Sequence, residues 1–189
     1  VSYQFNPGWG VDLEVLSGTS SRRDEQFDRD AYSVTSRWKN ADMELVNRLE
    51  YRSDEGSVSE NEQWVTTNRF AMTINDEWSL LGKFDYSETE DDNADNRTAR
   101  FAEADLGFAY RPIFNNKLNI LGVYSYLYDL DPLQQFGSTQ LDERSQVLSL
   151  EAIYDLNQFF ELGAKFAWKK SELRIARDQG DFFDNSTTL

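Results

Sequence analysis

The sequence contains no cysteine and no histidine among its 189 residues. Without cysteine it has no disulfide framework, no thiolate nucleophile and no iron–sulfur site. Without histidine it has no Ser-His-Asp or Cys-His catalytic set, no His-ligated zinc and no haem held by an axial His. Carboxylates are abundant, but a pair acts as acid and base only in a cleft that shifts its pKa values. We therefore predict no catalytic residue, no metal site, no cofactor and no enzymatic activity.

Positive charge is scarce. The chain has 34 Asp and Glu residues against 19 Lys and Arg residues, which gives a net charge of −15 and a pI near 4.3. A nucleic-acid-binding surface needs a basic face, so we expect no nucleic-acid partner. The length is that of one domain, and we predict a single domain over residues 1–189.

Long hydrophobic runs are also missing. No stretch approaches the roughly 18 consecutive apolar residues of a membrane-spanning helix, and the mean hydropathy is −0.68. This pattern leaves a transmembrane β-barrel open, because barrel strands are only about half apolar and a hydropathy window averages their signal away.

Strict alternation of apolar and polar residues is the main feature that is present. From Glu77 to Glu88, one parity reads Trp78, Leu80, Gly82, Phe84, Tyr86 and the other reads Ser79, Leu81, Lys83, Asp85, Ser87. Successive side chains of a strand point to opposite faces, so this segment predicts a strand with an apolar and a polar face. The same split recurs in residues 43–52, 101–111 and 159–169.

The alternation predicts about ten strands joined by connections of alternating length. We expect them near residues 1–6, 8–19, 30–39, 42–53, 62–74, 77–89, 99–112, 117–130, 143–155 and 159–172. Short links with turn chemistry, such as Asn6-Pro7-Gly8 and Asn75-Asp76, pair the strands into hairpins. Long polar loops are expected near residues 20–30, 54–62, 88–98, 130–142 and 173–186. Short turns at one end and long loops at the other are typical of an outer-membrane barrel with extracellular loops.

Strand length and aromatic placement favour a membrane barrel over a soluble acidic barrel or sandwich. Many predicted strands have ten to thirteen residues, whereas globular strands cluster near about five or six and a tilted membrane strand needs about nine to eleven. Aromatic residues of the apolar parity gather at both strand ends, as in the two girdles of an outer-membrane barrel. The predicted membrane-interface residues are Trp9, Trp38, Trp64, Trp78, Tyr86, Tyr110, Tyr126, Tyr128, Phe160 and Trp168.

Charged residues of the opposite parity are expected to face the lumen, where they are tolerated when solvated or paired. They are Asp12, Glu14, Arg37, Lys39, Glu44, Arg48, Glu50, Arg52, Lys83, Asp85, Glu103, Asp105, Arg111, Glu151, Asp155, Glu161, Lys165 and Lys169. Two readings stay open: a hydrated, salt-bridged interior that holds the barrel together, and a pore whose charges set ion preference.

The predicted long loops are strongly acidic. Asp91-x-Asn93-x-Asp95 resembles the start of a calcium loop, but Asn96 replaces its glycine and Ala102 stands where the bidentate Glu belongs. We interpret the segment as a solvated loop, with weak cation bridging to lipopolysaccharide phosphates as a hypothesis.

The stretch from Phe108 to Leu130, FAYRPIFNNKLNILGVYSYLYDL, resembles a hairpin of the outer-membrane barrels that end large, repeat-bearing surface proteins of Gram-negative bacteria. Asn68-Arg69-Phe70-Ala71 and the segment Trp78–Tyr86 are similar to the preceding hairpin of that group, so the resemblance runs from Thr66 onward. It implies a barrel that anchors or displays attached domains, and it carries over no catalytic residue.

The last residues, Ser186-Thr187-Thr188-Leu189, read like the start of another strand, whereas bacterial barrels usually finish on a strand with a terminal aromatic residue. An even strand number of twelve to fourteen is therefore expected for the native barrel. Because unpaired strand edges in lipid cost several kcal/mol per backbone group, we expect the chain to be a fragment or its edges to be closed by strands from elsewhere. A closed ten-stranded barrel would contradict this expectation.

Three functions follow as hypotheses. The first is a non-enzymatic membrane anchor or scaffold of a larger surface protein in the bacterial outer membrane, in contact with lipid and lipopolysaccharide. The second is a porin-like channel for small solutes or ions, which a stable conductance would distinguish from a plugged anchor. The third is a soluble acidic ligand-binding barrel, which should fold without detergent.

Overall fold

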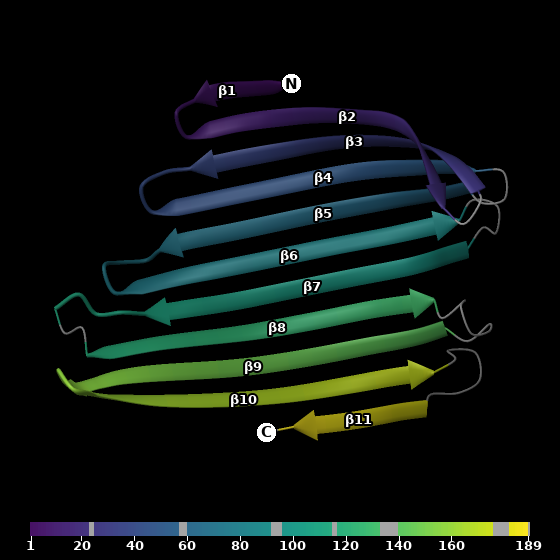
Figure 1. The fold of residues 1–189 in the computed structure, drawn as a ribbon. Coiled ribbons are helices and arrows are strands. Elements are labelled where there is room, and N and C mark those ends of the chain that lie inside the picture. Colours follow the sequence, from purple (N-terminus) through teal and green to yellow (C-terminus); the bar gives the residue numbers. More distant parts are fainter. Residues whose placement is uncertain are drawn as a thin grey trace.

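The computed structural model describes residues 1–22, 25–56, 60–91, 96–114, 117–132, 140–175 and 182–188. Within these residues the chain forms one eleven-stranded antiparallel sheet, in which each strand pairs with its neighbours in sequence (Figure 1). None of the residues described belongs to a helix that is long and apolar enough to cross a membrane. The predicted all-β, up-and-down architecture is therefore confirmed.

Nine of the strands are long, and the first and last are short. The strands are β1 Ser2–Asn6, β2 Trp9–Arg22, β3 Glu25–Lys39, β4 Met43–Gly56, β5 Glu60–Thr73, β6 Trp78–Asp91, β7 Asn96–Tyr110, β8 Leu118–Pro132, β9 Gln140–Asn157, β10 Phe160–Ile175 and β11 Phe182–Thr188. The long strands have 14 to 18 residues, which exceeds the nine to eleven that span a bilayer.

Asparagine side chains close four of the short turns. The Oδ1 atom of Asn40 accepts hydrogen bonds from the backbone N–H groups of Asp42 and Met43 at 2.9 and 2.7 Å. Asn6, Asn75 and Asn157 accept equivalent backbone bonds two or three residues ahead. These Asx turns are the turn chemistry expected from the sequence, and they fix the register of each hairpin.

The strands extend well into the segments predicted as long loops. The structure continues β2 to Arg22 and starts β3 at Glu25, and β10 continues to Ile175 with β11 starting at Phe182. The predicted bounds of these loops are therefore wrong. No residue from Thr19 to Arg22 is apolar, so alternation gives no signal there, yet backbone pairing with β3 continues. In β10 the apolar residues Leu173 and Ile175 have the opposite parity to Trp168, and backbone pairing with β11 likewise continues.

The sheet is open. β1 and β11 form its two edges, and each long strand contacts only the strands next to it in sequence within the described residues. The two chain ends lie at opposite edges in Figure 1. The described sheet is thus not a closed ten-stranded barrel, and the eleventh strand begins at Phe182 rather than near Ser186.

Candidate functional site: the two faces of the sheet

The pairing register sorts the side chains into two faces, since residues directly opposite each other in antiparallel strands point to the same side. We call the side that carries Trp78 and Phe84 the apolar face and the side that carries Lys83 and Asp85 the polar face. One cross-strand row of the apolar face runs through Trp9, Trp38, Leu45, Phe70, Gly82, Leu106, Tyr124, Leu148 and Trp168. The alternation predicted for four segments thus joins into one continuous surface.

Exposure on the two faces is the reverse of that in a soluble protein. On the apolar face, Leu106 is 60% exposed and Trp64 is 50% exposed. On the polar face, Glu50 is only 8% exposed and Ser145 only 5%. Soluble domains bury large apolar side chains and leave carboxylates in water, and these four residues show the opposite preference. The polar face also exposes other side chains, among them Glu14 at 62% and Leu81 at 51%.

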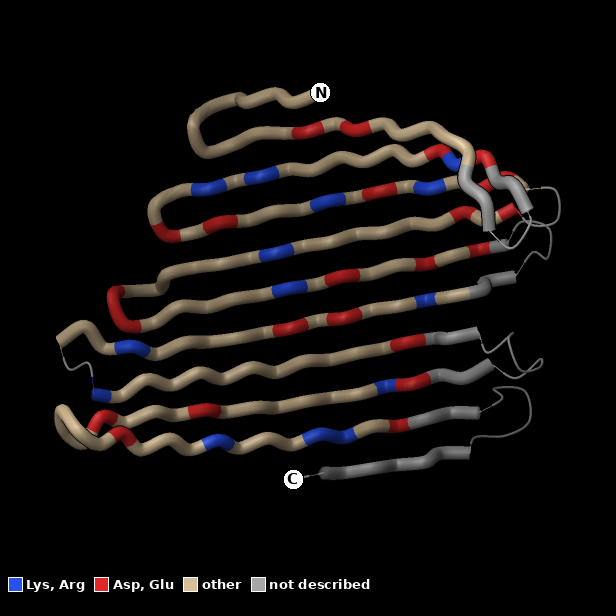
Figure 2. The backbone as a smooth tube through the Cα atoms, in the orientation of Figure 1, with Lys and Arg blue, Asp and Glu red and all other residues tan. Residues whose placement is uncertain are grey.

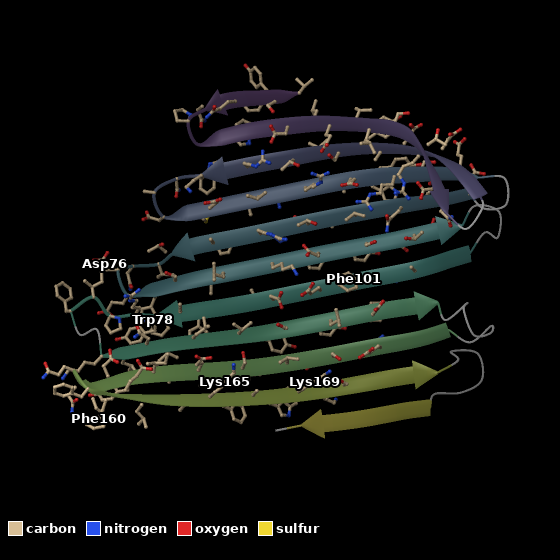
Figure 3. The ribbon with its side chains drawn as sticks, in the orientation of Figure 1. Asp76, Trp78, Phe101, Phe160, Lys165 and Lys169 are labelled. Carbon is tan, nitrogen blue, oxygen red and sulfur yellow. The ribbon has the colours of Figure 1, made fainter. Side chains whose placement is uncertain are left out.

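The register places on the polar face all the predicted lumen residues that lie within strands, and Arg111 directly follows β7. Charged positions are spread along β2 to β10 in Figure 2. Lys165 and Lys169 follow each other along the same side of β10 (Figure 3). That this face encloses a lumen stays a prediction, because the sheet is open.

The polar face is hollowed. A hollow of about 740 Å³ is lined by residues that include Val46, Leu81, Lys83, Glu103 and Val123. A second hollow of about 820 Å³ lies over β2 to β4, next to side chains such as Asp12 and Arg48. The polar side chains therefore occupy the concave side of the curved sheet.

Lys83 is the centre of one ion cluster on the polar face. Its Nζ atom lies 2.7 Å from a carboxylate oxygen of Glu103, 3.3 Å from Asp85 and 3.9 Å from Asp105. Arg69 approaches Asp85 from β5 at 3.9 Å. One ammonium group thus bridges three carboxylates from the adjacent strands β6 and β7.

Glu50 is the centre of a second cluster. Its carboxylate accepts hydrogen bonds from Arg48, at 3.0 Å from Nε, and from Arg52. Arg48 also lies 3.4 Å from Glu14 on β2. Because the Glu50 side chain is only 10% exposed, these paired arginines replace the water that it loses. The contact between Arg48 and Glu14 links β4 to β2 across β3.

The aromatic residues of the apolar face form contacts near the short turns. Trp78 packs against Tyr110 with ring centroids 4.6 Å apart. Figure 3 shows Trp78 and Phe160 at the short-turn ends of their strands. Trp9 and Trp38 are directly opposite each other in the same region of β2 and β3.

The second set of predicted interface aromatics lies inside the strands rather than at their ends. Trp64 and Tyr128 are four residues from the strand ends Glu60 and Pro132, and Trp168 is seven residues from Ile175. They lie inside the strands because the strands continue beyond their predicted ends, and their place at a membrane interface stays a prediction. Tyr86 and Tyr126 are similarly inset.

Polar groups mark the limit of this second aromatic set. The Tyr51 hydroxyl donates to Glu62 at 2.7 Å, and its ring lies 4.9 Å from that of Trp64. On β6 the hydroxyl of Tyr86 donates to Glu88, which pairs with Arg100 at 2.7 Å. Rings that rest on apolar surface while their hydroxyls reach carboxylates are suited to a boundary between two solvents.

Two features of the apolar face are invisible to sequence reasoning. The Phe108 ring covers Gly122 on the neighbouring strand, where a Cβ atom would lie 2.2 Å from Cε1 of the ring. Asn47 and Asn68 are directly opposite each other and share a 2.6 Å hydrogen bond. Both contacts depend on the cross-strand register, which alternation within one strand does not specify.

The segment from Asp91 to Asp95, which resembles the start of a calcium loop, lies outside the residues with described side chains. Among the described residues, no group of three or more acidic side chains is arranged to hold a metal ion.

No protein-family model and no curated protein matches this chain.

Proposed function

We propose that this protein is a non-enzymatic β-barrel of the bacterial outer membrane that anchors a larger surface protein. The observation that carries the proposal is the reversed exposure of the two faces. Leu49, Leu106 and Phe166 are about half exposed or more on the apolar face, while Glu50 is nearly buried on the polar face. Lipid on one side and a hydrated interior on the other satisfies both faces.

The length of the apolar band supports this proposal. On β6 it runs from Trp78 to Tyr86, and eight residue steps of about 3.4 Å cover about 27 Å along the strand. A strand tilt of about 40° reduces this to about 21 Å along the membrane normal, close to the roughly 25 Å band of such barrels. Glu88, the next residue of this face, is charged and paired with Arg100.

Closure of the barrel requires at least one more strand. In the described part of the chain, which has eleven strands, β1 and β11 run in the same direction, so they cannot pair antiparallel to each other. An up-and-down antiparallel barrel has an even number of strands. We propose that a strand from the same protein or from a partner chain lies between the two edges, giving a barrel of twelve to fourteen strands with its acidic loop end toward the outside of the cell.

A porin-like channel is the second candidate. The hollowed polar face with its charged side chains favours it, since an open lumen lined by such groups conducts ions. A soluble ligand-binding barrel is the third, and it would require the apolar face to be covered by protein rather than lipid. The anchor and the channel differ in whether the lumen is plugged.

The test is to refold the chain with and without detergent micelles and to follow far-UV circular dichroism and gel mobility before and after heating. The membrane proposal predicts β-structure and heat-modifiable mobility only with micelles. Folding in plain buffer would contradict both the anchor and the channel. Bilayer recordings then separate these two, because the anchor predicts silence and the channel predicts a stable conductance.

A further inference from the structure

A polar patch interrupts the apolar face at the middle of β4 and β5. On β4 the apolar-face residues are Met43, Leu45, Asn47, Leu49 and Tyr51, and on β5 they are Met72, Phe70, Asn68, Thr66 and Trp64. Each strand therefore has an asparagine midway between its methionine and its aromatic residue, while the same face continues beyond the aromatic residue to Ser53 and Glu62. Ser36 lies opposite Asn47 on β3, which extends the patch to a third strand.

On β6 to β8 the same cross-strand row is apolar, since it continues from Asn68 to Phe84, Ala104 and Tyr126. Beyond them it reaches Gln146 on β9 and Lys170 on β10. From β3 to β8, the polar side chains of this row are thus confined to β3, β4 and β5. A side-chain amide in hydrocarbon is costly unless its hydrogen bonds are satisfied.

The side-chain amide of Asn68 finds hydrogen-bond partners for its N–H and C=O groups within the chain, whereas that of Asn47 finds partners for only some of them. Asn68 accepts the bond from Nδ2 of Asn47 and donates to Oγ1 of Thr66 at 3.1 Å and to the carbonyl oxygen of Phe84 at 3.0 Å. Asn47 uses one of its two N–H donors, and within the described residues its Oδ1 atom accepts no recorded bond.

We propose that the sector around Asn47 is a self-association surface, through which two copies of this protein meet side by side in the membrane; this inference rests on the proposed membrane location. An amide offers both a donor and an acceptor, so two Asn47 side chains related by a two-fold axis can exchange N–H···O bonds reciprocally. Such a self-complementary contact is what a symmetric dimer requires.

The neighbouring side chains fit a contact of this kind. Leu45 and Leu49 lie one position to each side of Asn47 along the apolar face of β4, and Leu49 is 50% exposed. Two copies inserted in the same direction are related by an axis parallel to the membrane normal, so their tilted strands cross at this sector. The amide pair lies at the crossing point and the leucines surround it.

The absence of cysteine from the sequence allows a clean cross-linking experiment on the full chain refolded in micelles. Leu49→Cys places a thiol beside Asn47, and Leu106→Cys places one at a similarly exposed leucine on β7. The proposal predicts that a short bis-maleimide gives a covalent dimer at least five times more abundant for Leu49→Cys than for Leu106→Cys. Equal yields for the two variants would overturn it.

A second variant tests the amide itself. Asn47→Leu is expected to keep the micelle-dependent circular dichroism and heat-modifiable mobility but to shift the protein from dimer to monomer in sedimentation velocity. A wild-type protein that folds in micelles as a monomer, or a dimer that survives Asn47→Leu, would contradict the proposed surface and leave the membrane location intact. Folding without micelles would instead contradict the membrane location.

Discussion

The two faces of this sheet carry opposite chemistry on the same backbone. The apolar face exposes leucine and aromatic side chains, while the polar face buries Ser33, Thr35, Ser145 and the carboxylate of Glu50 and carries the ion clusters. Adjacent residues of one strand point to opposite faces, so whether a side chain lies on the apolar or the polar face depends only on its odd or even position in the strand. A single strand can therefore satisfy lipid on one side and water on the other.

The largest effect is expected from a charge at the middle of the apolar face. Leu106→Arg puts a guanidinium among the acyl chains of the proposed bilayer, and should lower the free energy of unfolding by about 2–4 kcal/mol. The measurement is urea unfolding in bilayers followed by tryptophan fluorescence. The control, Leu81→Arg, puts the same charge on the polar face at a residue that is 51% exposed, and it should cost less than about 1 kcal/mol. Equal costs would remove the distinction between the faces.

A smaller effect is expected on the polar face at Glu50. Glu50→Gln removes the charge that Arg48 and Arg52 share, and because the side chain is nearly buried we expect a loss of about 1–3 kcal/mol. The matched control is Glu44→Gln, whose partner Lys39 is 70% exposed, and which should change the unfolding free energy by less than about 1 kcal/mol. If Glu44→Gln cost as much as Glu50→Gln, the Glu50 cluster would have no special role.

The smallest effect concerns packing on the apolar face. Gly122→Ala places a methyl group against the Phe108 ring, which must turn away, so we expect a loss of about 1 kcal/mol. Gly163→Ala on the polar face meets nothing within 4 Å and should be neutral or slightly stabilising. Thermal unfolding in micelles measures both variants. A stabilised Gly122→Ala protein would show that the ring and the glycine do not form a unit.

Much of this architecture was predictable because it depends on local sequence. Alternation in Trp78 to Tyr86 specifies both faces, and Asn75-Asp76 specifies the turn before it. The strand ends were not predictable, because segments such as Thr19 to Arg22 have no apolar side to alternate with and are held by pairing with β3. The same extension explains why Trp168 lies in mid-strand rather than next to a loop.

The contacts between strands were the part of the candidate site that sequence reasoning missed. Lys83 was predicted to lie on the polar face, but its position among three carboxylates of β6 and β7 follows only from the register. The pairing of Asn47 with Asn68, 21 residues apart, is equally non-local. The only local signal of this pairing was an asparagine at a position where the alternation predicts an apolar residue.

The most direct test of the central claim uses the five tryptophans, Trp9, Trp38, Trp64, Trp78 and Trp168, all of which the register places on the apolar face. The refolded protein is placed in bilayers whose acyl chains carry bromine, and quenching of its tryptophan fluorescence is compared with quenching by iodide in the aqueous phase. Contact of the apolar face with lipid predicts strong quenching by the brominated lipid and weak quenching by iodide. Strong quenching by iodide with little effect of bromine would mean that the apolar face does not contact lipid.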